Sequence, residues 1–228
     1  FPDFKDPRLN DAFKNLPETI QAFAGSLDIN TIEKYVDSQV FFNNGSIIFW
    51  ILGISIGVNL FATEEDRGTL ETTLATKIPR GRLYFEKFLA MIAIFSAVNL
   101  AGIAAIWVAS VIIHEPISVL RLFQAGAVLL LFTMLLGSFS FAVGAITGRK
   151  NLAIGLPVVT LVAMFLLYTF AQSIDWLKGW DKATWNYFYS HGRTFINGID
   201  FSDMSVLIIS TAVFALAGWL VFRKRDLR

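Results

Sequence analysis

The 228-residue sequence contains no cysteine, which excludes disulfide bonds and thiol chemistry. It also lacks HExxH and GxxxxGK[ST], the second of which cradles ATP phosphates in many proteins. Charged residues make up only 16% of the chain, against about 25% in ordinary soluble domains, and the net charge is +1. No basic face is available for nucleic acid, because lysines and arginines lie at the ends of uncharged stretches. A protease, a transferase and a P-loop ATPase are therefore not expected in this chain.

The charges that are present leave five long windows without any. These windows are 22, 26, 26, 24 and 19 residues long, whereas a helix needs about 20 residues to cross the bilayer core. A charge at mid-membrane costs about 2.5–3.5 kcal/mol, and a soluble chain of this length has too little interior to bury five such helices on all sides. We therefore expect an all-α, polytopic integral membrane protein, with spans at about 41–62, 88–113, 122–147, 151–174 and 204–222.

Lysine and arginine residues in the short loops predict the orientation of these spans. Eleven lie on one side, in the first loop, in the turn between the third and fourth spans, and after the fifth. The two loops of the opposite side hold four. The richer side is expected to be cytoplasmic, which places the C-terminus inside the cell and residues 1–40 outside. Such an outer segment needs something to carry it across, so we expect a sixth span before Phe1.

The outer segments are expected to be ordered. Residues 1–40 should contain short amphipathic helices, because apolar side chains recur near helical spacing at Leu9, Phe13, Leu16, Ile20 and Phe23. Asn30 and Glu33 form an N-cap pattern, whose helix should run into the first span. Aromatic residues crowd segment 175–203 and are expected to anchor at the headgroup level, with ligand stacking as the alternative.

Small residues mark the predicted contacts between helices. Gly53 and Gly57 form one GxxxG pair, and Gly144 and Gly148 form another. Alanines recur every four residues in the second span, at Ala93, Ala97, Ala101, Ala105 and Ala109. Because each step of four drifts about 40° around a helix, this alanine ridge suits a crossing neighbour. Pro157 is expected to kink or interrupt the fourth span.

Few polar side chains lie within the predicted windows, and none of them is acidic or a histidine. Ion-coupled carriers use such groups to bind and release the coupling ion, so a proton-coupled carrier is not expected. Asn59 and Asn99 are selected as possible contacts to a transported molecule, with interhelical hydrogen bonding as the alternative. Active transport would then need energy from another polypeptide.

The loop 63–82 interrupts two uncharged windows with eight charges. Leu70, Leu74 and Ile78 recur at steps of four residues and predict a short amphipathic helix. Acidic residues in its first turn agree with the helix dipole, and Pro79 ends it. Two roles fit these residues. The helix lies in the membrane surface, or it presents leucine and glutamate side chains to a cytosolic partner's groove.

The segment EEDRGTLETTLATKIPRGRLYFEKF resembles the loop of ABC exporter permeases of the type-2 class. The matching positions are Glu65, Arg67, Gly68, Thr69, Leu70, Glu71, Leu74, Pro79, Arg80 and Lys87. The ending WLVFRKRDLR is similar to the Phe, basic and Arg-Asp-Leu ending of that class, and INGIDFSD is a weaker similarity. The order of spans and loops agrees over nearly the whole chain. The turn TKIPRGR departs from the usual pattern through Lys77-Ile78 and the inserted Gly81, which bears on partner fit rather than on class.

This resemblance implies the permease subunit of an ATP-driven exporter in the plasma membrane. Loop 63–82 would be a coupling helix that docks on a separate ATP-binding subunit, present in two copies. A second permease subunit would complete a homodimer or a related heterodimer. This chain would hold no cofactor and no catalytic residue, because ATP and Mg²⁺ would bind to the partner. The implied docking residues are Glu65, Arg67, Gly68, Leu70, Glu71 and Leu74.

In that docking, the leucines would be buried in the partner and the glutamates would meet its basic residues. Gly68 would let two backbones approach closely, because it has no Cβ. A different class of function is the alternative: a membrane scaffold or sensor subunit that recruits a cytosolic protein through the same helix and passes no substrate. The sequence specifies no substrate among drugs, lipids, peptides and ions, and the direction of transport rests on the resemblance.

Overall fold

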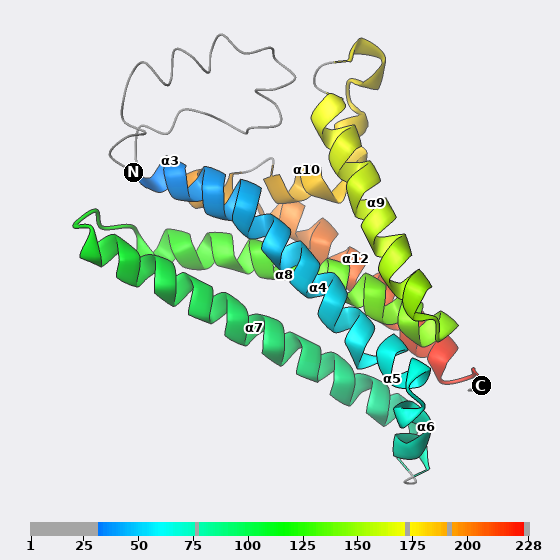
Figure 1. Ribbon diagram of the computed structural model, residues 1–228. Helices are drawn as coiled ribbons and strands as arrows, with labels where there is room; N and C mark the ends of the chain where they lie inside the picture. Colours follow the sequence, from blue (N-terminus) through cyan, green and yellow to red (C-terminus); the bar gives the residue numbers. More distant parts are fainter. Residues whose placement is uncertain (1–31, 76–77, 172–173, 191–192, 226–228) are drawn as a thin grey trace. The chain divides into compact units, whose positions relative to one another are not determined.

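The computed structural model describes residues 32–75, 78–171, 174–190 and 193–225. Within these residues every regular element is a helix, which confirms the predicted all-α fold (Figure 1). Of the predicted outer segment 1–40, only the part from Ile32 onward belongs to them. The amphipathic helices and the cap at Asn30 lie outside the described residues.

Five helices of the described chain are long and apolar enough to cross a membrane. They are Ile32–Leu60, which joins α3 (Ile32–Val36), the π-helical η2 (Asp37–Asn43) and α4 (Asn44–Leu60), then α7 (Arg80–Ile112), α8 (Val119–Thr147), α9 (Lys150–Phe170) and α12 (Phe201–Phe222). The prediction of a polytopic membrane protein with five spans in this chain is confirmed.

The helices are longer than the uncharged windows, because each helix can continue through charged residues beyond the membrane core. α7 begins at Arg80 rather than near residue 88 and carries Glu86 in its second turn. The first candidate span begins at Ile32 and includes Asp37. The expectation that the spans contain no acidic residue is therefore wrong at their ends, although it holds for the windows from which it was made.

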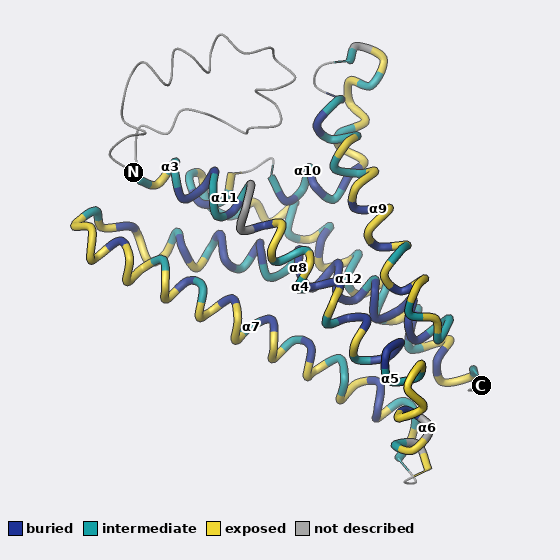
Figure 2. Tube along the Cα trace, viewed as in Figure 1, coloured by how far each residue is buried: buried dark blue, intermediate teal, exposed yellow. Residues whose placement is uncertain are grey.

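The chain divides into two compact units, described separately below. Unit 1 consists of Phe1–Ile48, Leu100–Leu129 and Val162–Met204. Unit 2 consists of Phe49–Asn99, Leu130–Leu161 and Ser205–Arg228. Each unit contains part of every span. α8 is the most buried of the five candidate spans: 78% of its most apolar window is buried, against 22% for α7 and α9 and 17% for α12 (Figure 2).

Unit 2 has an aromatic core where the ends of its helices converge. The ring centroid of Phe61 lies 4.9 Å from that of Phe141 and 4.5 Å from that of Phe222. The Tyr84 ring lies 4.9 Å from Phe141, and its hydroxyl donates a 2.7 Å hydrogen bond to the Ala215 carbonyl oxygen. All four rings are buried. Because lipid is as apolar as these rings, close packing stabilises this core.

Glycines permit close contact between α4 and α8, as the first GxxxG pair predicts. A Cβ placed on Gly53 would lie 2.9 Å from the Thr133 carbonyl oxygen, and one on Gly57 would overlap the backbone of Gly137. In the second pair, a Cβ on Gly144 would lie only 3.2 Å from the Cβ of Ala62. Packing is thus confirmed as the role of these glycines.

Two other predictions about the spans have different outcomes. All five alanines of the alanine ridge are exposed, so within the described residues the ridge of α7 is not covered by another helix. α9 continues through Pro157 from Lys150 to Phe170, so the proline does not interrupt the fourth span. The proline is the eighth residue of α9, and its missing N–H removes a single bond of the helical ladder.

The described part of the segment between α9 and α12 contains four short helices. They are η3 (Asp175–Leu177), η4 (Trp180–Ala183), α10 (Trp185–Ser190) and α11 (Thr194–Asn197). Trp176 and Trp180 are 77% and 61% exposed. This exposure agrees with anchoring in the headgroup region, which stays a prediction.

Candidate functional site

The loop between α4 and α7 contains two short helices instead of the single helix predicted. α5 (Ala62–Asp66) and α6 (Thr69–Leu74) are separated by Arg67 and Gly68. Gly68 has a φ of +71°, a left-handed conformation that residues with a Cβ rarely adopt. Its N–H ends α5 by donating to the Glu65 carbonyl oxygen at 3.0 Å. The chain therefore turns at Gly68 between the two helices (Figure 1).

The α6 side of this loop is anchored in the core of unit 2. Leu70 is completely buried and belongs to the same cluster as Phe61, Tyr84 and Phe222. A side chain enclosed in this way is not accessible to a partner in this conformation. Leu70 fixes the start of α6 against the ends of α7 and α12, and its predicted contact with a partner stays a prediction.

Two ion pairs fasten α5 to other parts of unit 2. Lys87 Nζ, on α7, lies 2.5 Å from Glu64 Oε2 and 5.6 Å from the centroid of the Phe61 ring. Arg225, just after α12, binds Glu65 with both Nη atoms, and the Nη1–Oε2 distance is 3.0 Å. The side chains of Glu65 and Arg225 are only 7% and 15% exposed. Salt therefore screens this bidentate pair much less than a surface pair.

Arg225 connects the loop to several helix ends at once. Its Nη1 also donates to the Ala145 carbonyl oxygen of α8 at 3.0 Å. Its own carbonyl oxygen accepts a hydrogen bond from Arg80 at the start of α7. Gly148, at φ +65°, leaves room for this arrangement, because a Cβ there would overlap the side chains of Arg225 and Glu65. The second GxxxG pair thus has a turn glycine at its second position rather than two packing glycines.

The turn between α5 and α6 is exposed, unlike its two ends. We call residues 66–69 the docking turn, after the role predicted for this loop; all four, from Asp66 to Thr69, are exposed. Apart from its two neighbours, a Cβ placed on Gly68 would have no atom of the described residues within 4 Å. The backbone of the turn is thus accessible from outside, whereas the residues before and after it are fixed by contacts within unit 2.

The six predicted docking residues therefore divide into three groups. Arg67 and Gly68 are exposed, whereas Glu65 and Leu70 make contacts within the chain. Glu71 and Leu74 belong to α6, but their side chains lie outside the part that the structure describes, so their roles stay predictions.

The two predicted pathway residues have different surroundings. Asn59, near the end of α4, is exposed and accepts a 3.0 Å hydrogen bond from the Thr63 hydroxyl through its Oδ1. Asn99, in α7, is buried at 6% exposure. The hydrogen bond of Asn59 supports a structural role one helical turn before α5, and contact of either residue with a substrate stays a prediction.

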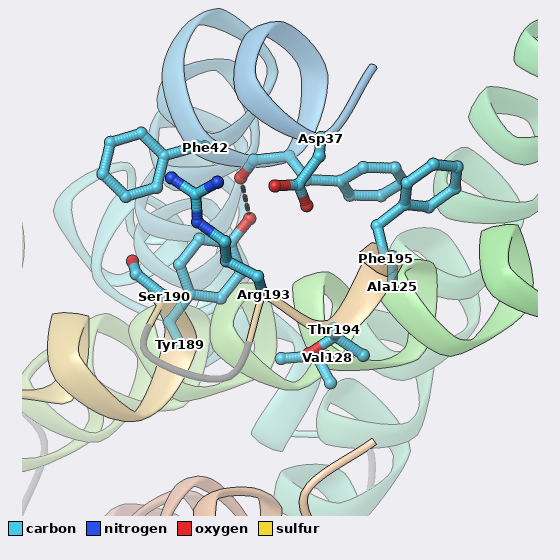
Figure 3. Close-up of a pocket in the computed structure, with 10 residues that line it drawn as sticks. Asp37, Phe42, Ala125, Val128, Tyr189, Ser190, Arg193, Thr194 and Phe195 are labelled. Atoms are coloured by element: carbon cyan, nitrogen blue, oxygen red, sulfur yellow. Dashed lines mark hydrogen bonds between the residues drawn. The ribbon is translucent and has the colours of Figure 1, made fainter. Parts of the chain in front are cut away.

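A second polar cluster lies in unit 1, beside η2 (Figure 3). Asp37 is 7% exposed and interacts electrostatically with Arg193. Tyr189 donates its hydroxyl hydrogen to the Phe41 carbonyl oxygen, and the Phe41 ring stacks on that of Phe195 with centroids 5.5 Å apart. Burial raises the pKa of the Tyr189 hydroxyl, and the Asp37 carboxylate raises this pKa further. The hydroxyl therefore keeps its proton and remains a donor.

The cavity lined by this cluster has a volume of about 30 Å³. That is room for about two water molecules and not for a transported solute. The cluster thus joins α10 and α11 to the first span rather than holding a substrate. Among the residues that the structure describes, no group of three metal-ligating side chains could hold a metal ion.

Sequence reasoning missed the residues that hold the loop and those of the unit 1 cluster. Lys87 and Arg225 were recognised as parts of motifs, but not as partners of Glu64 and Glu65. One signal in the sequence could have indicated these ion pairs. The acidic residues of the loop and the basic residues at two helix ends were predicted to lie on the same side of the membrane. Asp37 was missed because the first charge-free window, 41–62, was chosen to begin after this residue.

Comparison with protein families identifies the chain. The family model described as ABC-2 family transporter protein matches residues 9–227, which include all five spans, the loop and the basic C-terminal segment. No curated protein and no solved structure matches the chain. Proteins of this family are membrane subunits for transport rather than enzymes, and they associate with an ABC ATP-binding subunit. The chain therefore belongs to the ABC-2 transporter family and is a multi-pass permease subunit.

Proposed function

We propose that the docking turn is the site at which an ABC ATP-binding subunit engages this permease, and that the two form an ATP-driven exporter. The observation that carries this proposal is the contrast within one loop. Residues 66–69 are exposed, while Glu65 and Leu70, on either side of them, are held by Arg225 and by the core of unit 2. A segment that must receive a force needs this combination of an accessible tip and a firm attachment.

The attachments define how movement of the partner would reach the spans. A displacement of the docking turn acts on α7 through the Glu64–Lys87 pair and on the end of α12 through the Glu65–Arg225 pair. It acts on the end of α8 through the bond from Arg225 to the Ala145 carbonyl oxygen. Closure of two ATP-binding subunits would thus move several helix ends together. Glu65 and Leu70 are positioning residues in this mechanism, and Arg67 and Gly68 contact the partner.

Docking also sets the orientation of the chain. ATP and Mg²⁺ would be bound by the partner in the cytosol, so the docking turn and the C-terminus would face the cytoplasm across the plasma membrane. The excess of lysine and arginine at this end supports that orientation. Outward transport follows from the resemblance to exporters, and the family membership is compatible with it.

We test docking by reversing a charge at the exposed tip. Arg67→Glu should reduce co-purification with the ATP-binding subunit, and the ATPase stimulation in the complex, by about tenfold, because charge reversal at an interface weakens association strongly. Lys182→Glu is the matched control: it makes the same reversal at an exposed lysine in η4. Unchanged coupling in Arg67→Glu, or equal loss in both variants, would contradict the docking site. A complex that hydrolyses ATP without moving any solute would favour the scaffold alternative.

The exposed alanine ridge supports a permease dimer. Small side chains allow helix backbones to approach, and no helix of the described residues covers the ridge. A second permease copy, or a related subunit, would cover it. Because the chain lacks cysteine, Ala101→Cys introduces a single thiol, which we expect to cross-link between subunits under mild oxidation. Val159→Cys on α9, at a position 67% exposed, is the control. Equal cross-linking of both would contradict this interface.

A further inference from the structure

Unit 2 contains an open cleft that no residue of the docking turn lines. It lies where α8 ends, α9 begins and α12 ends, and its volume is about 810 Å³. The α12 side is apolar and is formed by Leu220 and Val221, and Ile146 and Leu152 extend the apolar surface onto α8 and α9. Leu152 and Val221 are exposed. A cleft of this size accommodates part of an amphiphile, whereas the cavity of unit 1 does not.

The remaining wall of the cleft is basic. It is formed by Arg149, Lys224 and Arg225, together with the hydroxyl-bearing Thr147. The charge of Arg225 is already neutralised by Glu65, so Arg149 and Lys224 contribute two positive charges to the cleft. Both are exposed. No acidic residue of the described chain lines the cleft. The cleft is therefore positively charged on one wall and apolar on the other, as a site for an amphiphilic anion requires.

The position of the cleft relative to the spans determines the kind of anion that reaches it. α8, α9 and α12 are all candidate membrane spans, and the cleft lies at the level where all three end. This is the level of lipid headgroups, with the apolar wall continuing toward the acyl region. α9 adds the positive end of a 21-residue helix, which begins at Lys150.

We propose that this cleft binds an anionic phospholipid, with its phosphate between Arg149 and Lys224 and an acyl chain along Leu152 and Leu220. The cleft has a complement for both halves of the ligand: two cations, for which no acidic residue among the described lining residues compensates, face the headgroup, and four aliphatic side chains face the acyl chain. Basic pockets between spans bind lipid headgroups on the same physical grounds. The proposal does not depend on docking, because no residue of the docking turn contributes to it.

The lipid would also affect the loop indirectly. Arg225 lines the cleft and at the same time holds Glu65. A phosphate beside Arg225 competes for its guanidinium or shares it, so the occupancy of the cleft can alter how firmly the loop is attached. The composition of the surrounding bilayer would thereby modulate the permease.

The test compares lipids on the full-length chain in mild detergent, by native mass spectrometry and thermal unfolding. Phosphatidylglycerol should bind on the order of tenfold more tightly than phosphatidylcholine with the same acyl chains. Arg149→Ala combined with Lys224→Ala should abolish this preference. Arg223→Ala is the matched control, because Arg223 is also basic and exposed but lies over the Trp219 ring, 5.2 Å from its centroid, outside the cleft. This control should keep the preference.

Two further measurements keep the proposal falsifiable. Glycerol phosphate, which has the headgroup charge without acyl chains, should bind at least about tenfold more weakly than phosphatidylglycerol, because it leaves the apolar wall empty. Leu152→Trp should fill that wall and weaken phosphatidylglycerol binding without changing the charge, even if the double variant fails to fold. Equal binding of both phospholipids, equal binding of glycerol phosphate, or a preference retained in the double variant would each overturn the proposal.

Discussion

The loop between α4 and α7 and the aromatic-rich segment between α9 and α12 both connect spans, but different forces attach them. The first is held by charges: Glu64 and Glu65 bind Lys87 and Arg225 within unit 2. The second is held in unit 1 mainly by neutral contacts, with Tyr189 bonded to the Phe41 carbonyl oxygen and aromatic rings stacked beside it.

This difference shows what each connection is suited to do. A shielded ion pair is directional and depends on both partners, because removing one leaves a buried charge without compensation. Neutral hydrogen bonds and stacked rings lose less when one group is removed. The first connection is therefore the sensitive one, as expected of an element that transmits movement. The second is suited to a static anchor, and variants in the two connections should differ in the size of their effects.

The largest effect is expected where the charged attachment is broken. Arg225→Met leaves Glu65, which is only 7% exposed, without its partner. We expect a loss of about 3 kcal/mol in the free energy of unfolding and loss of ATP-coupled transport. The first is measured by denaturant unfolding in detergent and the second in proteoliposomes with the ATP-binding subunit. Arg82→Ala is the control, because its pair with Glu86 is 72% and 50% exposed and should cost under about 0.5 kcal/mol.

A charge swap sharpens this prediction. Glu65→Arg combined with Arg225→Glu keeps the pair while exchanging its members, and should recover part of the stability lost in either single variant. The recovery will be incomplete, because Arg225 also bonds the Ala145 carbonyl oxygen, which a glutamate cannot do. Equal stability loss in Arg225→Met and Arg82→Ala would contradict the idea that the loop is held by a shielded pair.

The same contrast explains how far the sequence alone could predict the molecule. The five spans follow from charge-free windows, because the cost of a charge in lipid acts on each residue separately. The loop motif can be recognised in the sequence, but the sequence does not show which of its side chains point into the protein and which point outward. Leu70 was expected to contact a partner, and the letters do not show that it is buried in the same cluster as Phe61 or that the chain turns at Gly68 before α6. Contacts between residues 160 positions apart, such as Glu65 and Arg225, depend on how the helices converge.

A smaller effect is expected from the neutral attachment in unit 1. Tyr189→Phe removes one hydrogen bond and leaves the buried Phe41 carbonyl oxygen without it, which should cost about 1 kcal/mol. Because the folded protein raises the pKa of Tyr189, the contribution of this hydroxyl is present below the unfolded tyrosine pKa of about 10 and declines as pH rises above it. The wild type should therefore lose stability faster than Tyr189→Phe above about pH 10, as followed by unfolding midpoints. Parallel curves for the two proteins would contradict the buried hydrogen bond.

The smallest effect on stability is expected at the docking turn itself. A variant there should affect binding of the partner without affecting how the loop is attached to the spans. Asparagine tolerates the left-handed conformation better than other residues with a Cβ, and a Cβ on Gly68 meets no atom of the chain within 4 Å. Gly68→Asn should thus change the free energy of unfolding by under about 0.5 kcal/mol. It should nevertheless weaken the complex, because the new side chain occupies the space where the partner's backbone approaches. Binding of the ATP-binding subunit and unfolding are measured on the same preparation. Unchanged binding would show that the partner does not approach this turn closely, whereas a large loss of stability would show that the turn is not free in the folded chain.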